Sequence, residues 1–76
     1  MYTTPWCGYC QRLKGQMKRA GIEWTEVDID ADAEAEAFVK STNSGDATVP
    51  TLKFADGSTA TNPSIKQVQE KLAALA

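Results

Sequence analysis

The sequence contains no histidine, only two cysteines and no long hydrophobic run. With no histidine and a single pair of cysteines, one chain cannot complete the tetrahedral ligand set of a structural zinc site. No apolar stretch approaches the roughly 20 residues that a membrane-spanning helix needs. Two cysteines are also too few for a disulfide scaffold, so 76 residues must fold around a hydrophobic core. We therefore expect one domain spanning residues 1–76, with no membrane segment.

Basic residues are not in excess either. Eight lysines and arginines against ten aspartates and glutamates give a net charge of −2, which argues against nucleic-acid binding. The N-terminus lacks the basic and apolar regions of a secretory signal, which predicts a cytoplasmic protein. Cysteines in that compartment are expected to be reduced at rest. They therefore indicate catalytic, redox or metal-binding chemistry rather than a structural disulfide.

The hydrophobic periodicity predicts strands and helices in the order βαβαββα. A strand end at residues 1–4 leads into a helix from about Cys7 to Ala20, which Gly21 terminates. A second strand is expected over 22–29. Asp30 is the predicted N-cap of a second helix, which ends at residues 43–45.

The C-terminal part predicts a hairpin and a last helix. Residues 51–54 and 58–61 flank Asp56-Gly57, a dipeptide that favours a primed turn. Asn62 is the predicted cap of the last helix, with Pro63 at its first position. A strand-helix-strand start makes the first two strands parallel, and the hairpin adds antiparallel pairing. The prediction is an α/β fold with a four-stranded mixed sheet and helices on both faces.

The segment Trp6-Cys7-Gly8-Tyr9-Cys10 carries the chemistry. At a helix start, free backbone N–H groups and the positive dipole end stabilise a thiolate at Cys7. Cys10 belongs to the inward apolar stripe of the same helix, so we expect it to be more buried and less ionised. The hypothesis is that Cys7 is the nucleophile and Cys10 the resolving or auxiliary thiol.

Two other interpretations of the cysteine pair stay open at this point: a zinc half-site, and two incidental buried thiols. A CxxC motif beside a βαβ pattern favours redox chemistry.

Thr48-Val49-Pro50 precedes the third strand, where the missing backbone N–H of a proline costs the sheet no hydrogen bond. Because only about 5–6% of the peptide bonds that precede proline in folded proteins are cis, the residues alone favour a trans bond.

The order of elements, WCGYC at the first helix and TVP before the third strand resemble the thioredoxin superfamily in its small glutaredoxin-like form. The resemblance implies a thioredoxin-like fold and a cis Val49-Pro50 bond that faces the nucleophilic cysteine. Thioredoxins have proline at the place of Tyr9. Glutaredoxins bind the carboxylates of glutathione with a lysine before the active cysteine and a Gly-Gly-x-Asp-like turn. Residues 2–5 and 61–64 offer neither.

The combination YTTPWCGYC, TVPT, KFADGS and TNPS is similar to the actinobacterial mycoredoxins. That resemblance implies a monothiol oxidoreductase that reduces mycothiolated proteins, with mycothiol as co-substrate and no tightly bound cofactor. It also implies that a separate NADPH-dependent reductase recycles mycothiol disulfide. The chain itself has no G-x-G-x-x-G nucleotide signature.

Hydroxyl and amide side chains suit a neutral sugar thiol, and we single out Asn62 and Ser64 near the last helix. The others of this kind are Tyr9, Thr48, Ser58 and Thr61. Trp6 is expected to be an exposed lip of the site, and the backbone at Val49 and Pro50 is expected to meet the substrate. Each of these residues also has an interpretation as a cap, turn or strand residue, and Trp24 is expected to pack on the sheet.

Two functions of other kinds remain as alternatives. One is an iron-sulfur carrier in which two chains bridge a cluster through Cys7 and two small thiols. The other is a dithiol, thioredoxin-like electron donor that uses both cysteines and is reduced by a flavoprotein reductase. Whether Cys10 is needed for turnover separates the second from the monothiol hypothesis.

Overall fold

The computed structural model describes residues 1–76 and confirms the predicted order of elements. The bounds are β1 Tyr2–Thr3, α1 Gly8–Arg19, β2 Val27–Asp28, α2 Ala33–Thr42, β3 Thr51–Lys53, β4 Thr59–Thr61 and α3 Ile65–Leu75. None of these helices is long and apolar enough to cross a membrane.

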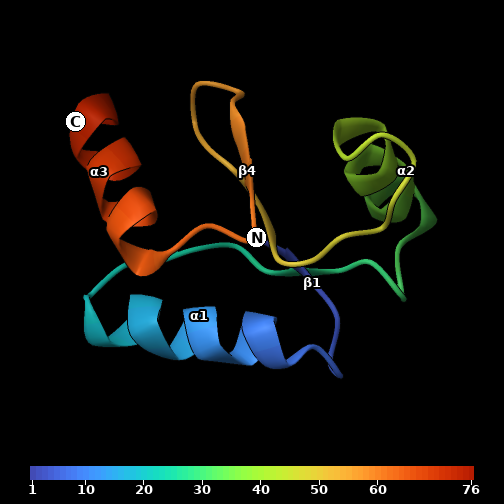
Figure 1. Ribbon diagram of the computed structural model, residues 1–76, viewed down its shortest axis with the longest axis horizontal. Coiled ribbons are helices and arrows are strands. Elements are labelled where there is room, and N and C mark those ends of the chain that lie inside the picture. Colours follow the sequence, from blue (N-terminus) through green and yellow to red (C-terminus); the bar gives the residue numbers. More distant parts are fainter.

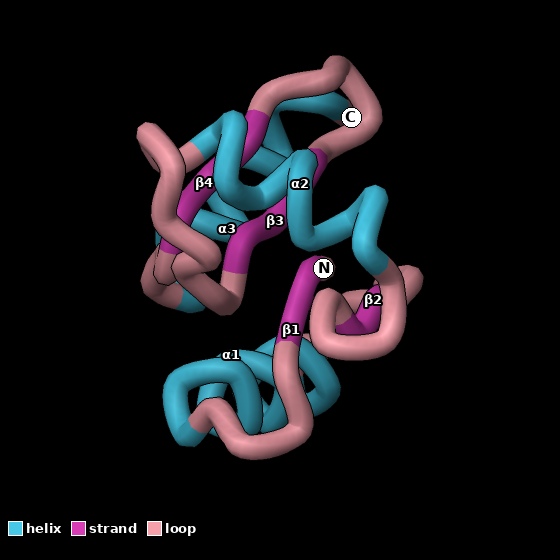
Figure 2. The backbone as a smooth tube through the Cα atoms, turned by 90° about the vertical axis from the view of Figure 1, so that its right-hand side faces the viewer, coloured by secondary structure: helices cyan, strands magenta, loops and turns pink.

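The strands form one mixed sheet in the order β2-β1-β3-β4. β1 is parallel to β2, with Tyr2 opposite Val27, because the helix between them returns the chain to the same end of the sheet. β3 runs antiparallel to both of its neighbours, so that Thr51 lies between Tyr2 and Thr61. The predicted sheet is therefore confirmed, and Figure 2 shows its inner strand β1 leading directly into the loop before α1.

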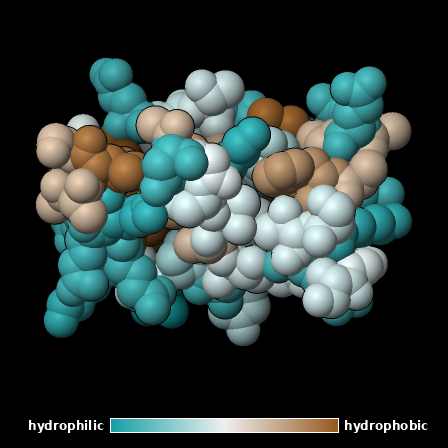
Figure 3. Space-filling view, turned by 90° about the horizontal axis from the view of Figure 1, so that it is seen from above, coloured by the Kyte–Doolittle hydropathy of each residue, from teal (hydrophilic) through white to brown (hydrophobic).

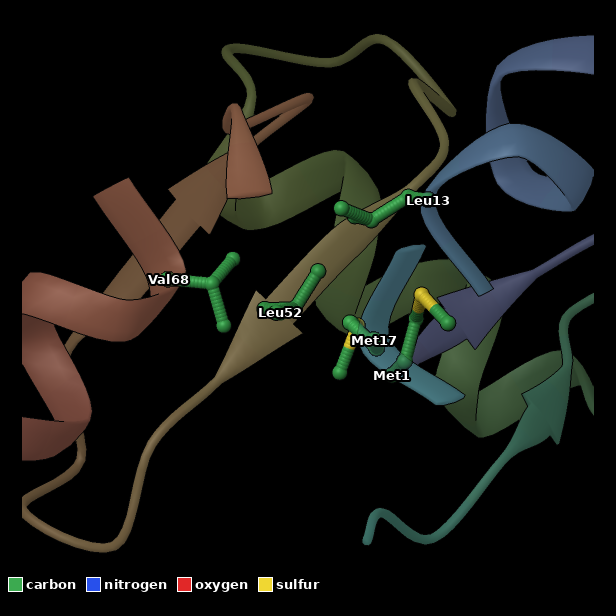
Figure 4. Packing of buried hydrophobic residues seen from close by; sticks show 5 residues of the cluster. All are labelled: Met1, Leu13, Met17, Leu52 and Val68. Atoms are coloured by element: carbon green, nitrogen blue, oxygen red, sulfur yellow. The ribbon is translucent and has the colours of Figure 1, made fainter. Parts of the chain in front are cut away.

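Helices cover both faces of the sheet, as predicted. In Figure 1, α1 lies along the lower edge, α3 on the left and α2 on the right. α1, α3 and β3 share the core cluster of Figure 4: Met1, Leu13, Met17, Leu52 and Val68. α2 belongs to a second cluster: Ile29, Ala35 and Val39. Met1 belongs to the first cluster and Tyr2 packs against the second, as neighbouring residues on opposite faces of a strand do.

The predicted second strand is wrong in its extent, because β2 covers only Val27–Asp28 of the expected residues 22–29. Pairing with the first strand begins where the Val27 N–H donates to the Met1 carbonyl at 2.9 Å. Before that point the Thr25 carbonyl accepts from the Met1 amino group, but residues 22–26 form no strand. Ile22 and Trp24 pack against the α1–α3 cluster instead, which confirms Trp24 as a packing residue.

The predicted N-cap of the second helix is also wrong, because Asp32 and not Asp30 caps α2. The Asp32 carboxylate accepts hydrogen bonds from the Glu34 and Ala35 N–H groups, both at 3.1 Å. Three aspartates at alternate positions compete for this role, and the helix begins at the last of them. The Asp30 carboxylate makes a different contact, which is described with the active site.

The cap of α3 is Ser64 rather than Asn62, and Pro63 precedes the cap instead of opening the helix. The Ser64 hydroxyl accepts from the Gln67 N–H at 3.1 Å, and the Gln67 side chain accepts from the Ser64 N–H at 2.9 Å. This reciprocal pair is a capping box. Asn62 has a φ of 46°, so it forms the turn that brings the chain from β4 to the cap.

The predicted hairpin between β3 and β4 is present, but its turn is not primed. Gly57 has a φ of 86° and Asp56 is not in the left-handed region, whereas a type I′ turn needs positive φ at both central residues and a type II′ turn needs it at the first. The Gly57 N–H donates to the Phe54 carbonyl at 2.9 Å, and the Phe54 N–H donates to the Ser58 carbonyl at 2.8 Å. Phe54 and Ser58 lie in the connection, so each strand is one residue shorter than predicted.

Candidate active site

The two cysteines lie where the chain passes from β1 into α1. Cys7 is the N-cap of α1, and Cys10 lies within its first turn. The Cys10 backbone N–H donates a hydrogen bond to the Cys7 sulfur at 3.2 Å, and both residues are free thiols. No acidic residue occupies the first turn of α1. The helix N-terminus therefore presents its free N–H groups to a sulfur nucleophile, as the sequence predicts.

Both thiols are buried, and Cys10 is buried more completely than Cys7. Cys10 is 0% exposed and Cys7 is 6% exposed, which confirms the expected order. Burial raises the pKa of the Cys10 thiol, and its hydrogen bond with Cys7 raises it further, while contacts with Thr3 and Thr4 oppose the rise. Cys10 is thus held as a neutral thiol beneath the Cys7 sulfur.

We expect the raised pKa of Cys10 to make the stability of the reduced protein depend on pH. Its contribution is fully present below the pKa of an unfolded thiol, about 8.5. It is lost as the pH rises towards the higher folded value, since the unfolded chain releases the proton first. Urea unfolding at several pH values between 7 and about 10 should show wild type losing stability relative to Cys10→Ser. A constant difference between the two proteins would contradict the prediction.

The loop before β3 faces the nucleophile. The Val49-Pro50 bond is cis, as the family resemblance implies and contrary to the expectation from the residues alone. The Cys7 thiol donates to the Val49 carbonyl at 3.7 Å, so residues 42 positions apart meet at the site. The Pro50 carbonyl accepts from the Asn62 N–H at 2.7 Å, which ties this loop to the start of α3. Thr48 is exposed on the same loop.

Two aromatic side chains flank Cys7 in the sequence and extend into solvent. Trp6 is 75% exposed and Tyr9 is 66% exposed, which agrees with Trp6 as a lip of the site. The Trp6 indole Nε1–H donates to the Asp30 carboxylate at 2.9 Å, so the lip is anchored to the end of β2. No pattern in the sequence indicated Asp30 as a neighbour of the site, since the pairing of β1 with β2 brings it there.

A groove of about 480 Å³ lies between α1 and the segment before α3. Tyr9, Asn62 and Ser64, which the sequence analysis expected to contact substrate, all line it. The other lining residues, which that analysis did not assign to the site, are Arg12, Leu13, Gln16, Pro63, Ile65 and Gln67. The spacing of Tyr9, Arg12, Leu13 and Gln16 puts them on one helix face, a signal that the sequence contained. Arg12 is the only charged residue in the lining.

Two other polar residues considered in the sequence analysis have contacts elsewhere. The Ser58 hydroxyl donates to the Asp56 carboxylate at 2.6 Å within the hairpin turn. The Thr61 hydroxyl donates to the Asn43 side chain. Neither residue lines the groove, so the structure supports their turn and strand interpretations.

A second hollow, of about 370 Å³, is mainly apolar and lies between α3, β3 and residues 22–25. It includes none of the residues expected at the active site. In Figure 3, hydrophilic and neutral residues cover most of the face in view, and hydrophobic areas lie right of centre and at the left, the side of α3 in Figure 1. Leu72 and Leu75 of α3 are both exposed and line this hollow.

The arrangement around Cys7 suits thiol–disulfide exchange. One thiol lies at a helix N-terminus, a second lies beneath it, and an extended loop passes beside the nucleophile. Attack on a disulfide requires a thiolate, an accessible sulfur and a leaving thiol. No group of three or more histidine, cysteine or acidic side chains is placed to hold a metal ion. The fold and the site together define a thiol oxidoreductase with a thioredoxin-like fold.

Comparison with known proteins gives the family. The glutaredoxin family model matches residues 1–58, and the chain belongs to the glutaredoxin family. It is 54% identical to a Mycobacterium tuberculosis protein described as a candidate glutaredoxin, over all of this chain and 90% of that protein. It is 43% identical to Mycoredoxin 1 of Corynebacterium glutamicum, over all of this chain and 94% of that protein. The crystal structure of a thioredoxin-like protein, in a mutant form, matches with a TM-score of 0.76 and 25% identity over 93% of each chain.

Proposed function

We propose that this protein reduces mixed disulfides between proteins and mycothiol by a monothiol mechanism with Cys7 as the nucleophile. The observation that carries the proposal is the groove that Tyr9, the residue between Gly8 and Cys10, lines together with Asn62 and Ser64; it combines hydroxyl and amide side chains with one cation. Such a surface suits a hydroxyl-rich sugar thiol without carboxylates. The likeness to Mycoredoxin 1 over the whole chain supports the same substrate class.

The reaction proceeds in two exchange steps. The Cys7 thiolate attacks the mycothiol sulfur of the mixed disulfide, which forms a Cys7–mycothiol disulfide and releases the target cysteine as a thiolate. A second mycothiol thiolate then attacks the bound mycothiol sulfur, which releases the Cys7 thiolate and mycothiol disulfide. In the overall reaction, the mixed disulfide and one mycothiol thiol are converted to the free target thiol and mycothiol disulfide. A separate NADPH-dependent reductase then reduces mycothiol disulfide to two mycothiol thiols.

The neighbours of Cys7 have distinct roles in this proposal. The Cys10 N–H, already 3.2 Å from the Cys7 sulfur, stabilises the thiolate in the attacking and the leaving steps. The Val49 backbone, which lies beside the sulfur, and Pro50 align the incoming disulfide. Trp6 and Thr48 contact the protein side of the substrate, because both are exposed next to this loop.

The proposal predicts a stable covalent intermediate on one cysteine. Cys10→Ser incubated with mycothiol disulfide is expected to gain one mycothiol at Cys7, because no second thiol can displace it. Intact-mass measurement followed by peptide mapping detects the adduct, and addition of reduced mycothiol should remove it. Cys7→Ser is the matched control and should gain none. An adduct on Cys10 of that control, or no adduct on Cys7, would refute the proposed mechanism.

A further inference from the structure

Asn43, at the C-terminal end of α2, is the centre of a network of polar side chains. Its Nδ2 group donates to the Val39 carbonyl at 2.9 Å and to the Thr51 hydroxyl at 3.3 Å. Its Oδ1 atom accepts a hydrogen bond from the Thr61 hydroxyl. One amide side chain therefore connects α2 with both β3 and β4.

Thr51 extends this network towards the active site. It is fully buried, and its hydroxyl donates its single proton to the Thr48 carbonyl at 2.8 Å. With that proton committed, the Thr51 oxygen can only accept from Asn43. If the Asn43 amide were rotated, its oxygen would face the Val39 carbonyl and the Thr51 oxygen, and none of the three could donate a hydrogen bond. The donor count thus fixes the direction of the chain of hydrogen bonds, from Asn43 through Thr51 to Thr48.

The end of that chain is the loop that faces the nucleophile. Thr48 begins the loop, and the Val49 carbonyl that follows lies 3.7 Å from the Cys7 sulfur. On the other side, the Pro50 carbonyl accepts from Asn62, the residue that follows Thr61. Asn43 therefore contacts Thr51 and Thr61, the residues next to the two ends of this hydrogen-bonded loop, although it contacts neither cysteine sulfur.

We propose that Asn43 is a positioning residue for thiol–disulfide exchange, which holds residues 48–50 against Cys7 through Thr51 and Thr61. The inference rests on the proposed function, since it takes this loop to align the disulfide that Cys7 attacks. Misplacement of reacting groups by about 1 Å can reduce a rate by as much as a hundredfold. Loss of the network should therefore impair alignment of the substrate and leave the intrinsic reactivity of the Cys7 thiol unchanged.

The test uses variants that remove the side-chain hydrogen bonds of the network at one residue each. Thr51→Val and Asn43→Ala break the network, and Thr51→Ser restores the hydroxyl. Ser41→Ala is the matched control, because the Ser41 hydroxyl also bonds to a backbone carbonyl near the end of α2 but lies outside the network. All are made in the Cys10→Ser background, so that only Cys7 reacts. Turnover of a mycothiolated peptide and alkylation of Cys7 by iodoacetamide are measured side by side.

We expect kcat/KM of Thr51→Val and Asn43→Ala to fall by about tenfold or more, with alkylation rates within about twofold of the parent. Thr51→Ser and Ser41→Ala should stay within about twofold in both measurements. Unchanged turnover in both network variants would overturn the proposal. Equal loss in Thr51→Ser, or a parallel fall in alkylation, would also overturn it, since either would point to packing or thiol reactivity. If Asn43→Ala does not fold, the Thr51→Val and Thr51→Ser pair decides.

A second substrate separates failure of this inference from failure of the proposed function. The rate at which Cys7 forms a mixed disulfide with bis(2-hydroxyethyl) disulfide does not depend on mycothiol. If wild type does not turn over the mycothiolated peptide, the same variants are compared in this reaction. A loss confined to the network variants would then support the role of Asn43 with a different thiol substrate, and equal rates would contradict it.

Discussion

Cys7→Ser is expected to abolish reduction of mycothiolated substrates, whereas Cys10→Ser should retain at least about half of the wild-type rate. We expect Cys7 to be the attacking thiol, because it caps α1, accepts the Cys10 N–H at 3.2 Å and faces the loop at Val49. Cys10 is completely buried and its pKa is raised by burial, so it deprotonates poorly. A thiol from solution can perform the second displacement instead.

The assay couples mycothiol, its disulfide reductase and NADPH to a mycothiolated peptide, with NADPH oxidation followed in time. Loss of the attacking thiol should reduce kcat/KM by more than about a thousandfold, the scale of removing a covalent nucleophile. The hydrogen bond from the backbone N–H of residue 10 to the Cys7 sulfur is retained in Cys10→Ser, because it does not involve the side chain of residue 10. Loss of activity in Cys10→Ser equal to that of Cys7→Ser would favour the dithiol, thioredoxin-like alternative.

Features that depend on local sequence could be predicted for this chain. The helix that carries the cysteines follows from the inward spacing of Cys10, Leu13 and Met17, and all three are buried. Cys7 at the N-terminus of that helix follows from the break at Pro5 and the apolar stripe after it. The mixed sheet follows from short connections and chain order. In each case, the deciding residues are within a few positions of one another.

Helix starts and strand ends were less predictable, because several residues offered the same interaction. Asp30 and Asp32 are both good caps; Asp32 caps α2, whereas the Asp30 carboxylate accepts a hydrogen bond from the Trp6 indole instead. For α3, the pattern of Ser64 followed by Gln67 does contain the capping box. The length of β2 depends on how much of β1 it can pair with, which no pattern within residues 22–29 reveals.

The parts of the site contributed by tertiary contacts could not be predicted from patterns at all. Trp6 meets Asp30 across 24 positions, and Thr61 meets Asn43 across 18. The cis Val49-Pro50 bond was implied by the resemblance and not by the residues alone. The spacing of Tyr9 and Arg12 indicated a shared helix face, but the groove exists only because that face of α1 lies opposite residues 62–67. Such contacts depend on the packing of whole elements and have no local signature.

Mycothiol is expected to support turnover with a kcat/KM at least about tenfold above that of glutathione, a difference of about 1.4 kcal/mol in transition-state stabilisation. Residues 2–5 and 61–64 contain no charged side chain for the carboxylates of glutathione. Among the groove residues, only Arg12 offers a cation, and it makes no ion pair within the protein. Its guanidinium can donate to sugar hydroxyls as well as to a carboxylate.

Arg12→Gln therefore separates charge recognition from recognition of a neutral thiol. A charge-assisted hydrogen bond contributes roughly 1.5–3 kcal/mol. The kcat/KM of the variant with glutathione should therefore be at least about tenfold below that of wild type. With mycothiol the loss should be about threefold or less, because glutamine still donates to a hydroxyl. Lys18→Gln is the matched control: it removes the same charge near the other end of α1, outside the groove. Each thiol is supplied with its own NADPH-linked reductase. Equal kcat/KM for both thiols in wild type would refute the proposed preference for mycothiol.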